Sequence, residues 1–304
     1  MSVFLGLLEN VLEEGLIYGI MAMGVYITYT ILDFPDLSVD GTFPLGACIT
    51  AALITSGVNP WLSCVIAFFC GALAGSVTGI IHVRLKVTDL LSGILVMTAL
   101  WSVNLVVTRG SSVLPFYNKP TIFNSGIAKL FPHEVYTHRI VIIALLCVLI
   151  VKLTLDWYLK TKSGLLLRAA GDNAQYVTSL AKNQGNVKIL GLAIGNGCTA
   201  LAGSVLAQQT ESANIVSGTG MVVMALASVI IGTTVFKRVR IIKQTTMAVL
   251  GAIIYKACLS IAMQLGLPTN FLKMLMAVLF TAALVSNNLF SKGKGDQNGD
   301  KTRL

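Results

Sequence analysis

Charged residues are scarce in this sequence: Asp, Glu, Lys and Arg make up 12% of its 304 residues, against about 25% in an average soluble protein. Hydrophobic residues make up 55%. This balance excludes an ordinary soluble domain and indicates a membrane protein. The formal net charge of +9 comes largely from Lys and Arg in short loops, so we interpret it as a signal of membrane orientation and expect no nucleic-acid partner.

Motifs for catalysis are also missing. The six cysteines form no CxxC pair and fall in apolar segments, and the three histidines have no nucleophile and acid near them in the sequence. No phosphate-binding loop of the GxxxxGKS or GxxxxGKT type occurs. We therefore expect a chain that is not an enzyme, holds no cofactor or metal, and takes its energy from another protein.

Residues 1–83 contain no Lys or Arg, so the basic start of a secretory signal peptide is missing and we expect the first apolar segment to be kept.

Long apolar runs approach the roughly 20 residues that cross a bilayer as a helix. A helix is the open element that satisfies its own backbone in lipid, so we predict an all-α polytopic membrane protein of about eight to nine spans with short broken helices. The runs cover residues 15–32, 43–55, 61–83, 90–107, 140–155, 187–206, 221–236, 245–265 and 271–289.

The short loops give the orientation, because Lys and Arg collect on the cytoplasmic side. Counting spans between the basic clusters places all of them on one side and leaves residues 110–138 outside. The N-terminus lies outside if 43–55 crosses fully, which we favour, or inside if 15–55 is one re-entrant unit. We expect a single transmembrane domain over 1–291 and a disordered basic cytoplasmic tail over 292–304. The clusters are Arg84 and Lys86; Lys160, Lys162, Arg168 and Lys182; Lys237, Arg238, Arg240 and Lys243; and Lys292, Lys294, Lys301 and Arg303.

Two polar stretches interrupt the spans, at 33–42 and 208–220. The first holds three acids and Pro35, and we expect it to be unwound, with Phe43 and Pro44 opening the next helix. The motifs VDGT (39–42) and VSGT (216–219) each precede a short helix, and in our topology those helices run in opposite directions. This predicts an inverted-topology repeat, in which solute is handled where the repeats meet; a solvated turn and a chance similarity are the alternatives.

Candidate residues for the translocation pathway share a polar or helix-breaking character inside the apolar segments. Other polar residues within spans, including Asn196, are interpreted as structural. Lys256 is the costly exception, and it either snorkels, pairs with an acid or faces a water-filled cavity. The pathway candidates are Asp33, Pro35, Asp36, Ser38, Asp40, Gly41, Thr42, Phe43, Asn104, Gln208, Gln209, Glu211, Gly218 and Thr219.

A polar, basic island at 158–188 separates two spans and contains RAAGDNA (168–174). Together with LA (206–207), GTGM (218–221), ALASVIIG (225–232), IYGIMAMG (17–24) and DGTFPLGA (40–47), it resembles the permease subunits of ABC importers of the branched-chain amino acid and ribose type. The motifs occur in family order over most of the chain. One departure is the bulky, basic stretch at 232–238, where similar permeases carry a glycine-rich loop.

The resemblance implies a multi-pass protein of the bacterial inner membrane. Its partners would be a second permease chain, either identical or related, cytoplasmic ATPases that bind ATP and Mg, an external solute-binding protein, and membrane lipid, with the basic loop near 237 a candidate for lipid or ATPase contact. In similar permeases the segment matching 171–182 forms a coupling helix in a groove of the ATPase. The implied coupling residues are Arg168, Gly171, Asp172, Asn173, Ala174, Tyr176 and Leu180.

The transported solute is the least specified feature of the sequence. The resemblance points to the sub-branch associated with binding lipoproteins for amino acids, including aromatic ones, with sugars and nucleosides as alternatives. A self-sufficient secondary transporter or channel is the competing class and predicts transport without an ATPase.

We expect residues 110–138 to fold over the pore mouth and contact the binding protein, or else to form an interfacial flap anchored by aromatic residues. Trp61, Trp101 and Trp157 lie near span ends, where interfacial anchoring is the default interpretation.

Overall fold

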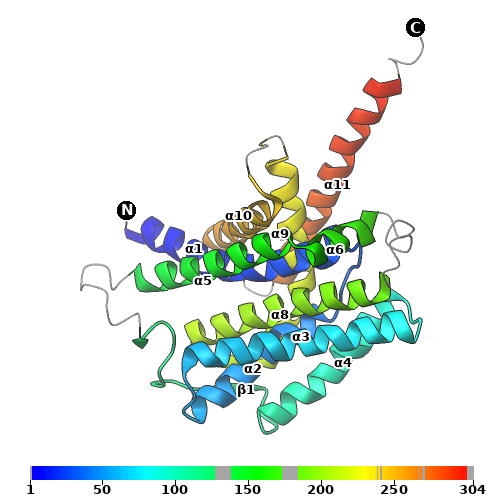
Figure 1. Cartoon of the computed structure of the whole chain (residues 1–304). Coiled ribbons are helices and arrows are strands. Elements are labelled where there is room, and N and C mark those ends of the chain that lie inside the picture. Colours follow the sequence, from blue (N-terminus) through cyan, green and yellow to red (C-terminus); the bar gives the residue numbers. More distant parts are fainter. Residues whose placement is uncertain are drawn as a thin grey trace.

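The computed structural model describes residues 2–126, 138–172, 184–237, 239, 242–266, 268 and 271–299. Within these ranges the chain is almost entirely helical, with one small two-stranded sheet (Figure 1). Seven helices among the described residues are long and apolar enough to cross a membrane, and two shorter apolar helices accompany them. The prediction of an all-α polytopic membrane protein is confirmed.

The first half of the chain contains one broken pair of helices. Helix α1 (Ser2–Val25) continues into a π-helical turn, η1 (Tyr26–Ile31), and the backbone is then non-helical as far as Ser38. A short helix, α2 (Val39–Thr55), follows, and α3 (Pro60–Arg84) and α4 (Asp89–Val107) are full spans.

The second half repeats this order of a long helix, a break and a short helix. Helix α8 ends at Thr210, and a strand and a 3-10 turn separate it from α9, which is the shorter of the two. The elements are β1 (Val113–Pro115), α5 (Arg139–Tyr158), α6 (Lys162–Asp172), α8 (Gln184–Thr210), β2 (Ser212–Asn214), η4 (Ile215–Gly218), α9 (Met221–Val235), α10 (Gln244–Gln264) and α11 (Leu272–Gly299).

Two differences from the sequence-based boundaries are notable. Helix α2 begins at Val39, so Pro44 lies inside the helix and does not open it; the prediction that Phe43 and Pro44 start this helix is wrong. Proline is tolerated there because only the carbonyl of Asp40 loses a helical partner, and Gly218 packs against that oxygen. Helix α11 continues to Gly299, without a break at residue 291.

Helix α8 is the centre of the bundle and packs closely against α1, α2 and α3. Glycines permit this approach, since a Cβ atom built on Gly46 would lie 1.8 Å from the carbonyl oxygen of Ala200, and one on Gly75 would lie 2.2 Å from that of Leu192. Such close backbone contact is typical of small-residue interfaces between membrane helices. The interpretation of the small-residue runs near 71–75 and 191–203 as packing surfaces is confirmed.

Contacts between helix ends identify the two sides of the bundle. His138, at the start of α5, pairs with Glu9 near the start of α1, and in Figure 1 both ends lie at the left while α6 lies at the right. At the opposite end, Lys243 contacts Asp156 near the end of α5. The N-terminus therefore shares a side with the outer segment, as we favoured.

The short helices α2 and α9 begin next to each other and run apart. Helix α2 leads to the turn before Trp61, beside which the outer segment passes at Gly126. Helix α9 leads to the loop that ends at Lys243, on the island side. The two short helices thus have opposite polarity, which is the arrangement that the inverted-topology hypothesis requires.

Candidate functional site

The non-helical stretch before α2 is fixed to α8 by a buried polar cluster. Asp36 is 4% exposed, and its carboxylate accepts hydrogen bonds from the Ser38 backbone N–H at 2.9 Å and from Asn196 Nδ2 at 2.6 Å. Ser38 Oγ in turn donates to Asn196 Oδ1 at 3.2 Å. Because every partner is polar and buried, the cluster determines where the unwound backbone lies. Asn196 has the structural role predicted for it.

Asp40 joins the two short helices. One carboxylate oxygen accepts the backbone N–H of Gly220 at 2.9 Å, and the other accepts that of Val222 at 2.8 Å. Helix α9 has no side-chain cap of its own, and Gly220 at its N-cap has φ of 90°. Asp40, in the first turn of α2, therefore caps α9 from another helix and also places a negative charge at its positive end.

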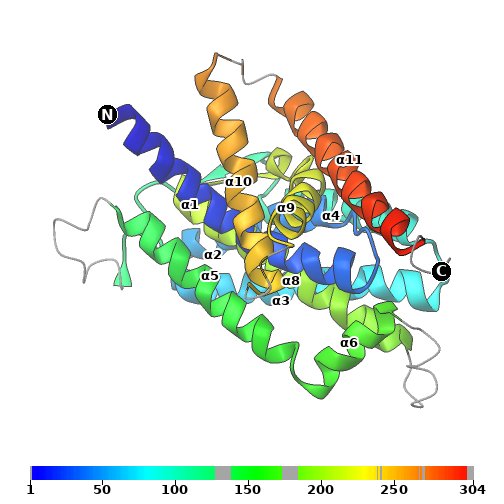
Figure 2. The same cartoon turned by 90° about the horizontal axis from the view of Figure 1, so that it is seen from above.

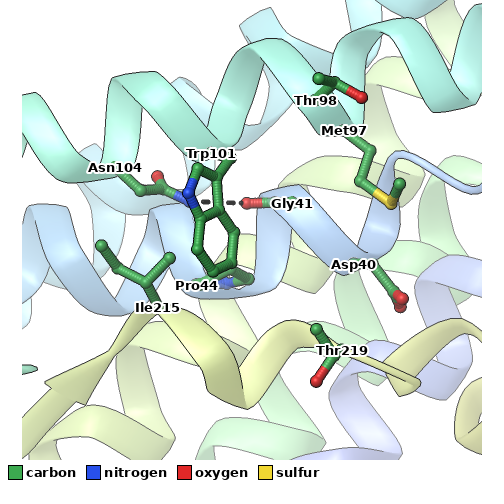
Figure 3. Close-up of a pocket in the computed structure, with 9 residues that line it drawn as sticks. All are labelled: Asp40, Gly41, Pro44, Met97, Thr98, Trp101, Asn104, Ile215 and Thr219. Atoms are coloured by element: carbon green, nitrogen blue, oxygen red, sulfur yellow. Dashed lines mark hydrogen bonds between the residues drawn. The ribbon is translucent and has the colours of Figure 1, made fainter. Parts of the chain in front are cut away.

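A pocket opens beside this junction, between α2, α4 and η4 (Figure 3). Its volume is ≈ 240 Å³. Figure 3 shows the Trp101 ring between α4 and the start of α2, with the Asn104 side chain next to it. The lining residues are Asp40, Gly41, Pro44, Met97, Thr98, Trp101, Asn104, Ile215 and Thr219.

Apolar walls and a few polar groups define the chemistry of the pocket. Met97, Trp101 and Ile215 supply the apolar surface. Asn104 is fully buried and donates from Nδ2 to the Gly41 carbonyl at 3.2 Å, while its Oδ1 has no hydrogen-bond partner within the described chain. Such a combination suits a small solute with one apolar and one polar part.

Charges of both signs lie beside the pocket. Asp40 contributes a carboxylate, and Lys273 of α11 donates from Nζ to Thr219 Oγ1 at 3.1 Å. The charge of Lys273 acts on Asp40, whose carboxylate also interacts with the backbone N–H of Met221. Both charges therefore lie at the junction between η4 and α9.

Sequence reasoning found part of this pocket. The structure brings the predicted Asp40, Gly41, Asn104 and Thr219 together in the lining, and Gly218 packs against the backbone of Asp40. The sequence did not predict the other lining residues, which are Pro44, Met97, Thr98, Trp101 and Ile215, nor Lys273 beside the pocket. A signal for the α4 residues existed, because Met97, Trp101 and Asn104 are spaced i, i+4, i+7 on one helical face.

Other candidates lie outside the pocket lining. Gln208 is 1% exposed and connects the outer segment to the bundle, since it accepts the Ile122 backbone N–H at 2.9 Å and contacts Cys64 Sγ at 3.1 Å. Gln209 donates to Glu13 at 3.0 Å. Phe43 is buried against Tyr18. The remaining candidates outside the lining are Asp33, Pro35, Asp36, Ser38, Thr42, Gly218 and Glu211.

Lys256 pairs with an acid, which is one of the three alternatives that its sequence position left open. Its Nζ lies 2.5 Å from Glu14 Oε2 on α1. The ammonium is mostly buried, with 12% of the side chain exposed. The pair joins α1 to α10 and compensates a charge that would otherwise be costly inside the membrane.

The outer segment is anchored to the bundle as far as the structure describes it. Strand β1 pairs antiparallel with β2, with Leu114 opposite Ala213. Phe116, Ile122 and Phe123 are buried, so the segment packs by its own aromatic and aliphatic side chains. Residues 127–137 lie outside the described part.

The island begins with α6, which packs against the end of η1. A Cβ atom on Gly171 would lie 1.6 Å from the carbonyl oxygen of Ile31, so the helix touches the backbone at the start of the unwound stretch. Arg168, Gly171 and Asp172 belong to α6. The other implied coupling residues, Asn173, Ala174, Tyr176 and Leu180, lie outside the described residues.

Comparisons with known proteins agree over nearly the whole chain. Residues 7–284 match the family described as "Branched-chain amino acid transport system / permease component". A tyrosine transport system permease protein of Clostridioides difficile strain R20291 is 43% identical over 280 residues, covering 92% of this chain and 91% of the relative.

More distant relatives are named for sugars. The ribose import permease protein RbsC of Escherichia coli K12 is 29% identical over 234 residues, covering 75% of this chain and 69% of the relative. The galactofuranose transporter permease protein YtfT of the same strain is 27% identical over 274 residues, covering 88% and 76%. No solved structure matches the chain.

Proposed function

The chain belongs to the family of permease components of branched-chain amino acid transport systems, and we propose that it forms the membrane pathway for an aromatic amino acid. It is a multi-pass inner-membrane permease of the ABC type, and permease subunits of this family are not catalytic. The pocket beside Asp40 carries the proposal, because an apolar wall with Trp101 lies next to a carboxylate and a lysine.

The groups around the pocket match the parts of such a cargo. A ligand ammonium would interact with Asp40, a ligand carboxylate with Lys273, and an aromatic ring with Trp101 and Met97. Ring stacking and S–aromatic contacts favour aromatic over aliphatic side chains. The tyrosine permease among the relatives supports this cargo, whereas the ribose relatives support a sugar.

Uptake by the reconstituted transporter tests the cargo. Proteoliposomes with the cognate ATPase and binding protein would be offered labelled tyrosine, leucine and ribose. We expect tyrosine uptake, and expect Trp101→Ala to lower it roughly tenfold, the effect of about 1.4 kcal/mol of lost contact. Leu73→Ala is the control, since Leu73 is a 67% exposed side chain that does not line the pocket. Ribose uptake without tyrosine uptake would replace the proposal by the sugar alternative.

A second permease chain is proposed to cover the pocket. The stretch from Asn214 to Gly220 adjoins the pocket through Ile215 and Thr219 and contains only the single 3-10 turn η4. Asn214, Val216 and Thr219 in this stretch are exposed. Irregular backbone inside a membrane requires cover by protein or a water-filled cavity. A second copy facing α4 and η4 would provide both, with the pathway enclosed between the chains.

The energy source and delivery are proposed to lie in partner proteins. A cytoplasmic ATPase would bind ATP and Mg and contact the island, and an external binding protein would dock on the outer segment. Co-purification of the ATPase with the wild type, and its loss when residues 171–182 are scrambled, would support the coupling role. Transport in vesicles without any ATPase would instead favour a secondary transporter.

A further inference from the structure

A second pocket lies at the cytoplasmic end of the bundle, far from the outer segment. Its volume is ≈ 330 Å³. It lies where the end of α5, the middle of α6, η1 and the start of α10 come together, and Figure 2 shows α6 turning away from the end of α5 there. The lining residues are Tyr26, Asp156, Leu159, Lys160, Arg168, Ile242, Lys243, Gln244 and Thr245.

The charges of this pocket do not cancel. Asp156 is already satisfied, because it accepts from Lys243 Nζ at 2.9 Å, from Thr245 Oγ1 at 2.8 Å and from Lys152 Nζ at 3.4 Å. Lys160 and Arg168 line the same space and have no acidic partner among the residues that the structure describes. Three cations thus face one carboxylate, and the pocket is suited to an anion.

The start of α10 adds to this preference. Lys243 is the N-cap of this 21-residue helix and makes no side-chain cap hydrogen bond. The partial positive charge of a helix N-terminus favours a phosphate or carboxylate. Gln244, the first residue of α10, accepts a hydrogen bond from the Tyr26 hydroxyl, which holds the helix start against η1.

We propose that this pocket binds a phosphate-bearing anion, supplied by the head group of an anionic phospholipid in the cytoplasmic leaflet. The two cations without acidic partners and the α10 terminus would hold the phosphate. Apolar side chains on the adjoining surface of α5, Leu153 at 63% exposed and Trp157 at 71%, would lie along the acyl chains, and Trp at this position is typical of a membrane interface. Inorganic phosphate has no apolar part that could contact this surface. The inference rests on the membrane placement and not on the proposed cargo.

Native mass spectrometry of the purified full-length chain tests the site. The detergent-solubilised protein would be titrated with phosphatidylglycerol, with zwitterionic phosphatidylcholine, and separately with inorganic phosphate. Lys160→Gln combined with Arg168→Gln removes the two cations without acidic partners and leaves the Lys243–Asp156 pair intact. Arg84→Gln combined with Lys162→Gln is the matched control, because both cations are exposed on the same side but do not line the pocket.

We expect phosphatidylglycerol to bind the pocket variant about tenfold more weakly, with the control variant unchanged and phosphatidylcholine adducts equal in all three proteins. Inorganic phosphate binding that is lost in the pocket variant, with unchanged lipid binding, would support the anion site but overturn the lipid as its source. Equal binding of every probe by folded variants, with matching unfolding temperatures, would overturn the proposal.

Discussion

At the scale of single residues, Asp40 has two tasks that both depend on its charge. It caps α9 through the N–H groups of Gly220 and Val222, and it lines the proposed solute pocket. A ligand ammonium bound to Asp40 in the proposed pathway would therefore also interact with the junction between α2 and α9.

Replacing Asp40 by Ala should destabilise the protein by about 2–3 kcal/mol, because two backbone N–H groups at a helix start lose a charged acceptor. Asp40→Asn should cost less, since one oxygen acceptor remains. Thermal unfolding in detergent measures both. Asp33→Asn is the control, because Asp33 is exposed in the same stretch and Asn tolerates its left-handed backbone with φ of 53°. It should change stability by no more than about 0.5 kcal/mol. Equal melting of Asp40→Ala and Asp33→Asn would show that the capping contact is not a stabilising one.

At the scale of elements, the contact between α2 and α8 depends on backbone approach. Gly46 on α2 and Gly203 on α8 each lie against a carbonyl of the other helix, with hypothetical Cβ distances of 1.8 Å to Ala200 O and 2.0 Å to Phe43 O. Each helix thus presents a glycine to the backbone of the other, so neither has room for a larger side chain at the contact. The position of α2, and with it Asp40, follows from this interface.

Gly46→Ala should therefore separate α2 from α8 and cost about 1–3 kcal/mol or more, as overpacking does. Gly6→Ala in α1 is the matched control, since no atom lies within 4 Å of its Cβ position and helix propensity favours Ala over Gly. Size-exclusion profiles and unfolding temperatures of the two variants measure the difference. A Gly46→Ala protein as stable as Gly6→Ala would contradict the close contact.

The outer segment also makes a prediction at this scale. Deleting residues 113–124 would remove β1 and the buried Ile122, so it would damage the fold together with any docking surface. Tyr117, which is 63% exposed, and the exposed Lys119 offer a cleaner test. Tyr117→Ala with Lys119→Glu should abolish stimulation of ATP hydrolysis by the binding protein and leave the unfolding temperature unchanged. Stimulation at the wild-type level would exclude this tip as the docking surface.

At the scale of the whole molecule, the sequence predicted features that follow a local pattern, such as the membrane spans. It did not predict which residues far apart in the chain contact each other. Span positions and orientation follow from hydropathy and from Lys and Arg, which are properties of local sequence. The Lys256–Glu14 pair joins residues 242 positions apart, and the cap by Asp40 joins residues 180 and 182 apart. Nothing local identifies such partners. The position of Trp101 near a span end predicts an interfacial anchor, whereas in the fold Trp101 lines the pocket together with Ile215 from the other half of the chain.

The most far-reaching prediction concerns the second permease chain. If a second copy covers the pocket, exposed residues on this face of α4 should approach their counterparts, because a two-fold interface brings the same patch of both chains together. Thr98 is exposed and lines the pocket, whereas Leu73 on α3 is 67% exposed but lies outside the lining. With Cys258 replaced by Ser, Thr98→Cys should form cross-linked dimers with a short bifunctional maleimide in membranes, and Leu73→Cys should remain monomeric. Cross-linking by Leu73→Cys alone would place the partner on α3, leave the irregular backbone at Asn214–Gly220 without protein cover, and require the pathway to be sought elsewhere.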